Sequence, residues 1–302
     1  MHNQTPLQHN TKGTEALHPE LIDSIARIRA SLEQQPRHLP PWSETQRAAP
    51  NEILRSALFT VRNRNQARPY LKDSPIVVIG EGEIRYRGEE LRQDDELVWL
   101  HLLHLAKAKA LGECVEFTPY AFLKALGWPV NRGGYQRLKT SLLRMMATAV
   151  EISSARLRQA VAVPMILRFR SEDPQTQRPL RRWQIWVAPE MCLLFGDGCL
   201  TRIDWEQRKR LPVGIATKLH GYWASHRRPF AVRVETLQKL CGSETLHKHF
   251  KTQLSEALEI LRREGFLLEW RIEEDLVRVA RPDEPCGGAA CDTTYDRSTI
   301  DL

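Results

Sequence analysis

Cations and hydroxyl side chains recur at helical spacing in one stretch of the sequence, a combination suited to contacting nucleic acid. They fall at positions i, i+3, i+4 and i+7 of a predicted helix, opposite its apolar residues: Arg137, Thr140, Ser141 and Arg144. Asn131 and Arg132 lie at the start of this helix, where a recognition helix approaches bases or phosphates. Because arginine holds phosphate or guanine and hydroxyls pair with either, the stretch predicts a DNA-reading helix.

A second stretch repeats this layout later in the chain. Its polar face carries His247, Lys248, Lys251, Thr252 and Ser255, and the opposite face of the same predicted helix is apolar. For any single residue of either stretch, a solvated helix face is the alternative interpretation. Because two helices share the layout, we predict that both contact nucleic acid.

Motifs of enzymes are absent from the sequence. It has no phosphate loop, no Gly-x-Ser-x-Gly elbow and no His-Glu-x-x-His zinc helix. His247 and His249 are similar to the paired metal histidines of rolling-circle nickases, but residues two apart on a helix face different directions. We therefore predict no enzymatic activity, no cofactor and no metal, and a nicking initiator is the enzymatic alternative.

The elements around the first stretch follow the order of a winged helix. The apolar spacing and the breaking residues predict a long helix starting near Asp94, then a short strand. Thr118 followed by Pro119 predicts the start of a short helix that ends at Gly127. The DNA-reading helix over 134–148 comes next, and extended segments follow it, as in a helix-turn-helix braced by strands.

The same order returns in the last third of the chain. We predict a helix over 212–226, a short strand, a short helix over 235–241, a long helix over 246–264 and a hairpin. The segment Phe122-Leu-Lys-Ala-Leu-Gly127 also matches Leu237-Gln-Lys-Leu-Cys-Gly242. A repeat of this kind predicts an α+β fold with two tandem winged-helix domains.

The 302 residues are predicted to divide into four parts. The N-terminal part is flexible, with an amphipathic helix over 20–35 and a proline-rich linker over 36–51. The four predicted parts are a flexible segment over 1–55, winged-helix domains over 56–198 and 199–282, and an acidic disordered tail over 283–302.

The overall charge favours an acidic partner such as DNA. Lysine and arginine number 44 against 37 acidic residues, which gives a formal net charge of +7. No apolar run is long enough to span a membrane and the N-terminus has no signal-peptide pattern, so we predict a cytoplasmic protein without membrane contact. Cys286 and Cys291 in the tail lack a second ligand pair and are predicted to be free thiols.

Several specific blocks resemble the TrfA family of plasmid replication initiators. The resemblance extends from about Pro41 to Arg281, and its blocks include Pro41-Trp42, Arg55-Ser-Ala-Leu-Phe-Thr60, Asp94-Asp-Glu-Leu-Val-Trp99, Leu126-Gly-Trp128 and Leu240-Cys-Gly-Ser243. Positions that match the first recognition helix of the family include Asn131, Tyr135, Arg144 and Ala147. The second helix, around 247–259, is less similar, as expected if this chain binds a different DNA sequence.

The resemblance implies a function and a set of partners. Such initiators bind direct repeats, called iterons, in double-stranded origin DNA through two winged-helix domains and help to open an adjacent AT-rich segment. They recruit the host initiator DnaA, the helicase DnaB and the sliding clamp, and they form homodimers that are less active in initiation. They are not enzymes, in agreement with the missing motifs.

Two alternatives stay open at this point. The clamp-binding motif of the family is matched only at Gln35 and Leu39 and lacks its phenylalanine, so clamp binding and an ordinary linker are both compatible with residues 33–39. A transcriptional repressor that binds operator DNA would use the same winged-helix chemistry and is the alternative function.

Overall fold

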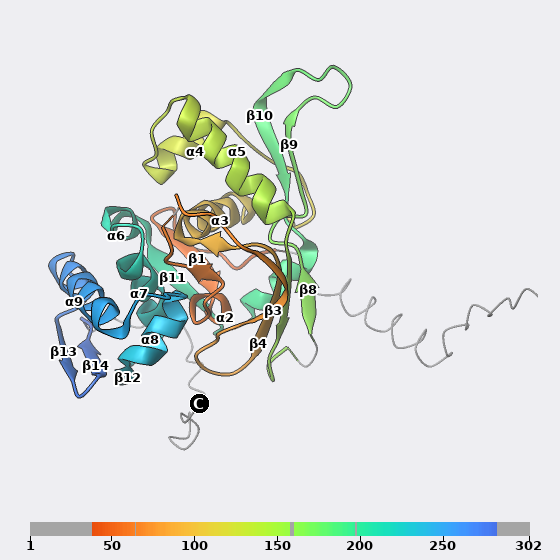
Figure 1. Ribbon diagram of the computed structural model, residues 1–302. Coiled ribbons are helices and arrows are strands. Elements are labelled where there is room, and N and C mark those ends of the chain that lie inside the picture. The colour runs from red at the N-terminus through yellow and green to blue at the C-terminus, as the bar shows by residue number, and fades with distance from the viewer. Residues whose placement is uncertain (1–37, 64, 158–159, 197, 283–302) are drawn as a thin grey trace, which may run out of the picture. The chain divides into compact units, whose positions relative to one another are not determined.

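The computed structural model describes residues 38–63, 65–157, 160–196 and 198–282. The predicted helix over 20–35, residues 33–37 of the clamp-like segment, and the acidic tail with Cys286 and Cys291 lie outside these residues. The described part is a mixed α and β fold, in which helices are interspersed among mainly antiparallel strands (Figure 1).

The buried side chains form two separate hydrophobic clusters. The first contains residues between Leu39 and Trp205, and the second contains residues between Leu211 and Val277. The change from one cluster to the other therefore falls within and just after one short helix, α6 (Trp205–Arg210).

The first cluster is built around helix α3 (Gln93–Ala106), of which nearly every residue is buried. Its other helices are α2 (Asn51–Leu54), α4 (Pro119–Leu126), α5 (Arg132–Met146) and the 3-10 helix η1 (Pro189–Phe195). Its strands are β1 (Gln46–Pro50), β2 (Phe59–Thr60), β3 (Tyr70–Ile76), β4 (Glu83–Glu89), β5 (Leu91–Arg92), β6 (Val115–Phe117), β7 (Ala149–Ser153), β8 (Val161–Val163), β9 (Arg168–Glu172), β10 (Pro179–Trp186) and β11 (Leu200–Asp204).

These strands form four small sheets around α3. The largest has the order β3-β4-β7-β8 with antiparallel neighbours, and a second has the order β6-β10-β9. Strand β1 pairs with β11, and β2 runs parallel to β5. Strand β9 also packs against α5, so the β9–β10 hairpin lies beside this helix (Figure 1).

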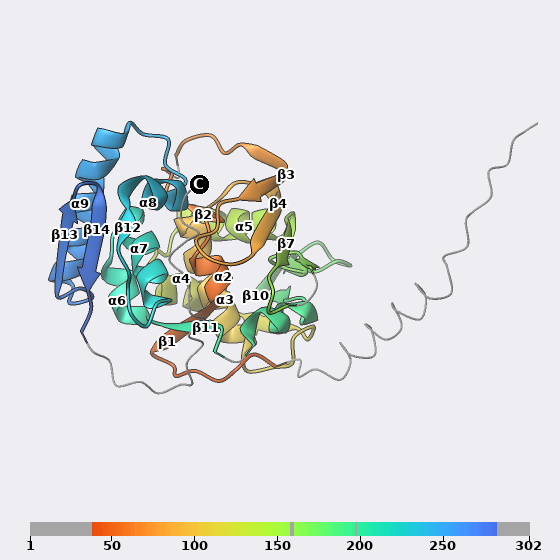
Figure 2. The same cartoon turned by 90° about the horizontal axis from the view of Figure 1, so that it is seen from below.

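The second cluster joins three helices to one three-stranded sheet. The helices are α7 (Ile215–Ala224), α8 (Val234–Cys241) and α9 (His247–Arg263), and the strands β12 (Val232–Arg233), β13 (Glu269–Glu273) and β14 (Leu276–Ala280) have the order β12-β14-β13. Helix α9 packs on α7 and α8 and lies beside the sheet (Figure 2).

The predicted order of helix, strand, short helix and long helix is confirmed in both clusters, as α3-β6-α4-α5 and α7-β12-α8-α9. Local chemistry explains the boundaries of α4, because Thr118 Oγ1 accepts a hydrogen bond from Ala121 N at 3.3 Å and Gly127 ends the helix with a φ of 68°. The long helix of the first group starts at Arg132 rather than at residue 134, because Asn131 Oδ1 caps it by accepting from Gly134 N at 2.9 Å.

The described part of the predicted proline-rich linker, residues 38–51, is packed into the fold rather than forming a linker. Residues 46–50 form β1, which pairs along its whole length with β11, and Leu39 and Trp42 are buried. Trp42 Nε1 donates a hydrogen bond to His104 Nδ1 of α3 at 3.1 Å. Prolines at 36, 40 and 41 precede the strand and Pro50 ends it, so none interrupts the ladder.

The β1–β11 pair also crosses the boundary predicted at 198/199. Ile203 of β11 and Trp205 of α6 are buried in the first cluster, whereas the predicted boundary assigns them to the second domain. The sequence pattern missed this because β11 is short and its partner lies about 150 residues earlier in the chain.

Candidate nucleic-acid interface

The start of α5 projects from a tight turn after α4. Asn131 and Arg132 are exposed there, and Asn131 also caps the helix. A Cβ on Gly134 would lie 2.0 Å from the carbonyl oxygen of Pro129, so only glycine lets the turn approach the helix this closely. The lack of a side chain at Gly134 thereby allows the tight turn that sets the position of the exposed first turn of α5.

The middle of α5 is turned toward the protein rather than toward solvent. Ser141 is buried, and its Oγ donates a hydrogen bond to Asp95 Oδ1 at 2.7 Å. Arg144 Nη1 lies 2.7 Å from the same carboxylate oxygen, and Arg144 Nε lies 3.3 Å from Glu89. Acidic residues of two other elements, Asp95 of α3 and Glu89 of β4, therefore cover these two side chains, and their role in reading DNA stays a prediction.

Arg137 is also held by the protein. Its guanidinium carbon lies 3.6 Å from the centre of the Trp128 ring, and Nη2 lies 3.5 Å from Asp94 Oδ2. About a quarter of the side chain stays exposed. Arg137 is thus fixed in direction beside the exposed first turn of α5, where it can still face a bound phosphate.

A hollow lies between the starts of α4 and α5 and strand β10. It has a volume of about 580 Å³ and is lined by Thr118, Pro119, Tyr120, Tyr135, Arg181 and Arg182. Tyr135 is half-buried, whereas Thr140, one turn further along α5, is exposed and receives a hydrogen bond from Gln136. Arg181 and Arg182 were not predicted from the sequence, although adjacent arginines in a strand beside a predicted recognition helix are a usable signal.

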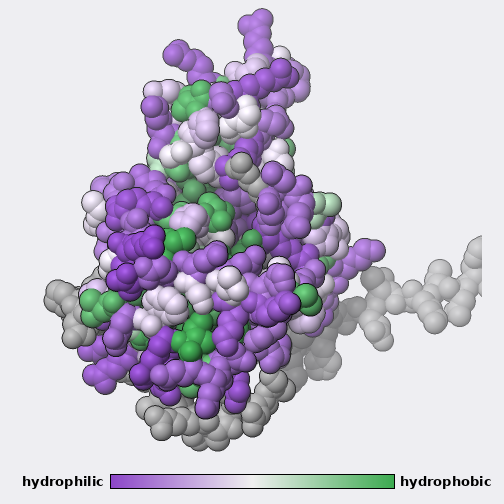
Figure 3. Space-filling model, turned by 60° about the vertical axis from the view of Figure 1, so that its left-hand side comes forward, coloured by the Kyte–Doolittle hydropathy of each residue, from purple (hydrophilic) through white to green (hydrophobic). Residues whose placement is uncertain are grey.

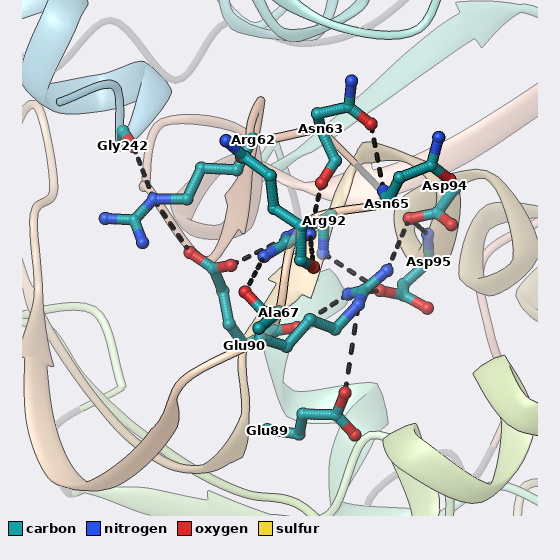
Figure 4. Close-up of polar contacts among 12 residues, drawn as sticks. Arg62, Asn63, Asn65, Ala67, Glu89, Glu90, Arg92, Asp94, Asp95 and Gly242 are labelled. Atoms are coloured by element: carbon teal, nitrogen blue, oxygen red, sulfur yellow. Dashed lines mark hydrogen bonds and ion pairs between the residues drawn. The ribbon is translucent and has the colours of Figure 1, made fainter. Parts of the chain in front are cut away.

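The acidic partner of α5 is itself surrounded by cations. Asp95 Oδ2 accepts from Arg68 Nη1 at 2.6 Å and from the backbone N of Arg92 at 3.0 Å (Figure 4). Burial and the neighbouring Asp94 carboxylate raise the pKa of Asp95, whereas Arg68 and Arg144 lower it. The ionised form of this carboxylate therefore depends on its arginine partners.

Helix α9 presents its polar face to solvent instead. Lys248 and Thr252 are exposed and, with His249 and Gln253, line a shallow hollow of about 350 Å³. Thr252 Oγ1 donates to the backbone oxygen of Lys248 at 3.2 Å. Ser255 is half-buried, and its hydroxyl donates to the backbone oxygen of Lys251 at 3.0 Å.

Lys251 and His247 of α9 face the β13–β14 turn, whereas Arg262 and Arg263 near the end of the helix pair with Glu259. Lys251 Nζ lies 2.5 Å and His247 Nε2 lies 3.4 Å from the Asp275 carboxylate. The hydrogen bond from Lys251, with the nearby charge of His247, lowers the pKa of Asp275. Asp275 is about half exposed, so this contact leaves both cations accessible to an incoming phosphate.

The surface near these helices is suited to a polar partner. Figure 3 shows one side of the molecule as largely hydrophilic, with small apolar areas that are separated from one another. Within the described ranges, no helix is long and apolar enough to cross a membrane. The part of the chain that the structure describes also contains no group of three or more potential metal-ligating His, Cys, Asp or Glu residues.

The arrangement of the elements is shared with proteins of known structure. Domains 2 and 3 of RctB match with a TM-score of 0.55 at 13% identity, over 78% of this chain and 99% of that one. The Pi initiator protein, solved in complex with iteron DNA, matches with a TM-score of 0.51 at 10% identity, over 81% of this chain and 100% of that one. This chain therefore shares its fold with domains 2 and 3 of RctB and with the Pi initiator protein.

Sequence comparison identifies the family of this chain. The family model of the TrfA protein matches residues 14–281, and the chain belongs to the TrfA family. This chain is 35% identical over 246 residues to the plasmid replication initiator protein TrfA of Escherichia coli. This match covers 80% of the present chain and 64% of the length of that relative. The resemblance seen in the sequence blocks is confirmed.

Proposed function

We propose that this chain is a plasmid replication initiator that binds iterons in origin DNA. The observation that carries the proposal is the exposed polar face of α9 in a chain that belongs to the TrfA family. The shared fold with Pi, which was solved on iteron DNA, supports the same class of ligand.

Each hydrophobic cluster is proposed to form one winged-helix domain. The first extends to Trp205 and the second begins at Leu211, with α5 and α9 as their recognition helices. The β9–β10 and β13–β14 hairpins are proposed to be the two wings. Lys139 of α5 braces the first wing, because its Nζ lies 2.8 Å from Glu172 of β9.

The two recognition helices are proposed to use different parts of their surface. Helix α5 contacts DNA with its exposed start, through Asn131 and Arg132, and with the exposed Thr140 further along the helix, while Arg181 and Arg182 of β10 hold nearby phosphates. Helix α9 contacts DNA along its length, through His247, Lys248, Lys251 and Thr252. Ser141 and Arg144 support α5 from behind.

The rest of the initiation process is proposed from the family. Binding to iterons promotes opening of an adjacent AT-rich segment and recruits host DnaA and DnaB, and homodimers limit initiation. The chain is proposed to work in the cytoplasm without enzymatic activity or a cofactor, since its sequence has no ATPase motif. Leu39, which the partial clamp motif would use, is buried, which argues against clamp binding through that residue.

A replication assay distinguishes an initiator from a repressor or a nickase. A plasmid that carries the candidate origin and no other origin should be maintained only in cells that supply this chain. Maintenance that does not depend on the chain would favour a repressor. A covalent nicked product formed on supercoiled origin DNA with a divalent metal would instead show a nicking enzyme.

A further inference from the structure

Three consecutive acidic residues at the start of α3 contact different parts of the protein. Asp94 and Asp95 hold α5, as described above. The next residue, Glu96, pairs with Arg208 of α6, and both side chains are almost completely buried, with 2% and 0% of their surface exposed. One helical turn therefore touches both the first recognition helix and the helix at which the second cluster begins.

Arg208 extends this connection to the second recognition helix. Its Nη2 also donates to Gln93 Oε1 of α3 at 3.1 Å, and its Nη1 donates to the backbone oxygen of Thr217 in α7. Helix α7 packs against α9. A continuous series of contacts thus runs from α5 through Asp95, Glu96, Arg208 and α7 to α9.

Other contacts between the two clusters surround this ion pair. Val61 N donates to the backbone oxygen of Cys241 at 2.9 Å, and the buried Lys218 donates to the backbone oxygen of Ser56. Arg62 lies between Gly242 and Glu90, 3.4 Å from an oxygen of each (Figure 4). Directional polar contacts therefore join the clusters, together with the apolar packing of Val61 and Ile79 against the second cluster.

We propose that the Glu96–Arg208 ion pair is a positioning device that fixes α5 and α9 in one register for reading DNA. A buried ion pair adds little to stability, since neutral replacements of similar volume are often equally stable, and its best-attested role is to fix register. This inference rests on the proposed function, because a fixed register matters only if both helices bind the same duplex. The expected consequence is recognition of two DNA segments at a single spacing.

The relative position of α5 and α9 can be measured without DNA, as the distance between labels on the two helices. Spin labels are placed on ketone-bearing residues introduced at the exposed Gln136 of α5 and Gln253 of α9, because native cysteines rule out thiol labelling. Pulsed electron spin resonance should give a narrow distance distribution for the full chain. The double variant Glu96→Gln, Arg208→Met, which removes both charges of the ion pair together, should give a clearly broader one. Equally narrow distributions in both proteins would overturn the proposal.

The consequence for DNA is tested with inserted base pairs. The probes are a duplex that carries one origin repeat and copies with two base pairs inserted between the segments that the chain protects in footprinting. The full chain should lose about tenfold or more in affinity on insertion, the size of a lost base contact. The double variant should lose much less, and an equal loss would contradict a register fixed by this ion pair.

A matched control separates register from general stability. Arg210 lies on the same helix as Arg208, but it pairs with Glu264 at the exposed end of α9, at 2.7 Å. Arg210→Gln should keep the narrow distance distribution and the full insertion penalty. If the full chain does not prefer the repeat over a scrambled duplex, the proposed function fails, whereas the spin-label result stands independently.

Discussion

Helices α5 and α9 carry similar polar residues, but the protein holds those residues in different ways. On α5, Ser141 and Arg144 are tied to the buried Asp95, and Arg137 is stacked on Trp128. On α9, the corresponding cations are either exposed or paired with a half-exposed carboxylate at the tip of a hairpin.

This difference shows that one residue pattern can serve two purposes. A guanidinium that satisfies a buried carboxylate orients its helix, whereas an ammonium at the surface is available to a phosphate. We therefore expect substitutions of Ser141 or Arg144 in α5 to change stability first and binding second. Substitutions on the exposed polar face of α9 should change binding alone.

The largest effect is expected where the α5 network is anchored. Asp95→Ala leaves Arg68 and Arg144 without their buried partner, which should lower the free energy of unfolding by about 3–5 kcal/mol. The matched change Asp275→Ala removes an exposed partner of α9 and should lower the urea midpoint far less, by no more than the small cost of alanine at a positive φ. Equal midpoints for the two variants would contradict the difference between the helices.

The next largest effect is a difference in DNA binding and stability between substitutions at the start of α5 and substitutions further along it. Arg132 is exposed, so Arg132→Ala should weaken repeat binding by about 1–3 kcal/mol and relax specificity at one base pair, with unchanged stability. Arg144→Ala should reduce stability and weaken all DNA binding together. Titrations against repeat duplexes with single substitutions measure both outcomes. A specificity change in Arg144→Ala at full stability would restore the direct base-reading role that the sequence predicts.

The smallest effect concerns a single phosphate contact of α9. Lys248→Ala should weaken binding to every duplex equally and reduce the slope of log K against log salt by about 0.9. Lys239→Ala removes an exposed lysine of α8 that pairs with Glu235 within the same helix, and it should leave the slope unchanged. Equal slopes for Lys248→Ala and the unsubstituted chain would remove this residue from the interface.

The sequence predicted the helix boundaries well because neighbouring residues determine where a helix begins and ends. Thr118, Gly127 and Asn131 cap or end helices through atoms a few residues away, and the structure confirms the resulting boundaries to within two residues. The β13–β14 turn was also predicted, and Glu274 and Asp275 adopt positive φ there.

Features that depend on distant partners could not be predicted in this way. A helical wheel places Ser141 and Arg144 opposite the apolar stripe, but it does not show that Asp95, more than forty residues earlier, covers them. Residues 46–50 look like a linker because their strand partner lies far along the chain. The ion pair of Glu96 with Arg208 likewise joins two segments 112 residues apart.

The most direct test of the central claim is the affinity of the full chain for its own origin repeat. Competition at physiological salt between a duplex with one repeat and a scrambled duplex of the same composition gives the specificity ratio. For an iteron-binding initiator we predict a ratio of about 10³ or more. A ratio near one, with the chain shown to be folded, would contradict sequence-specific origin binding.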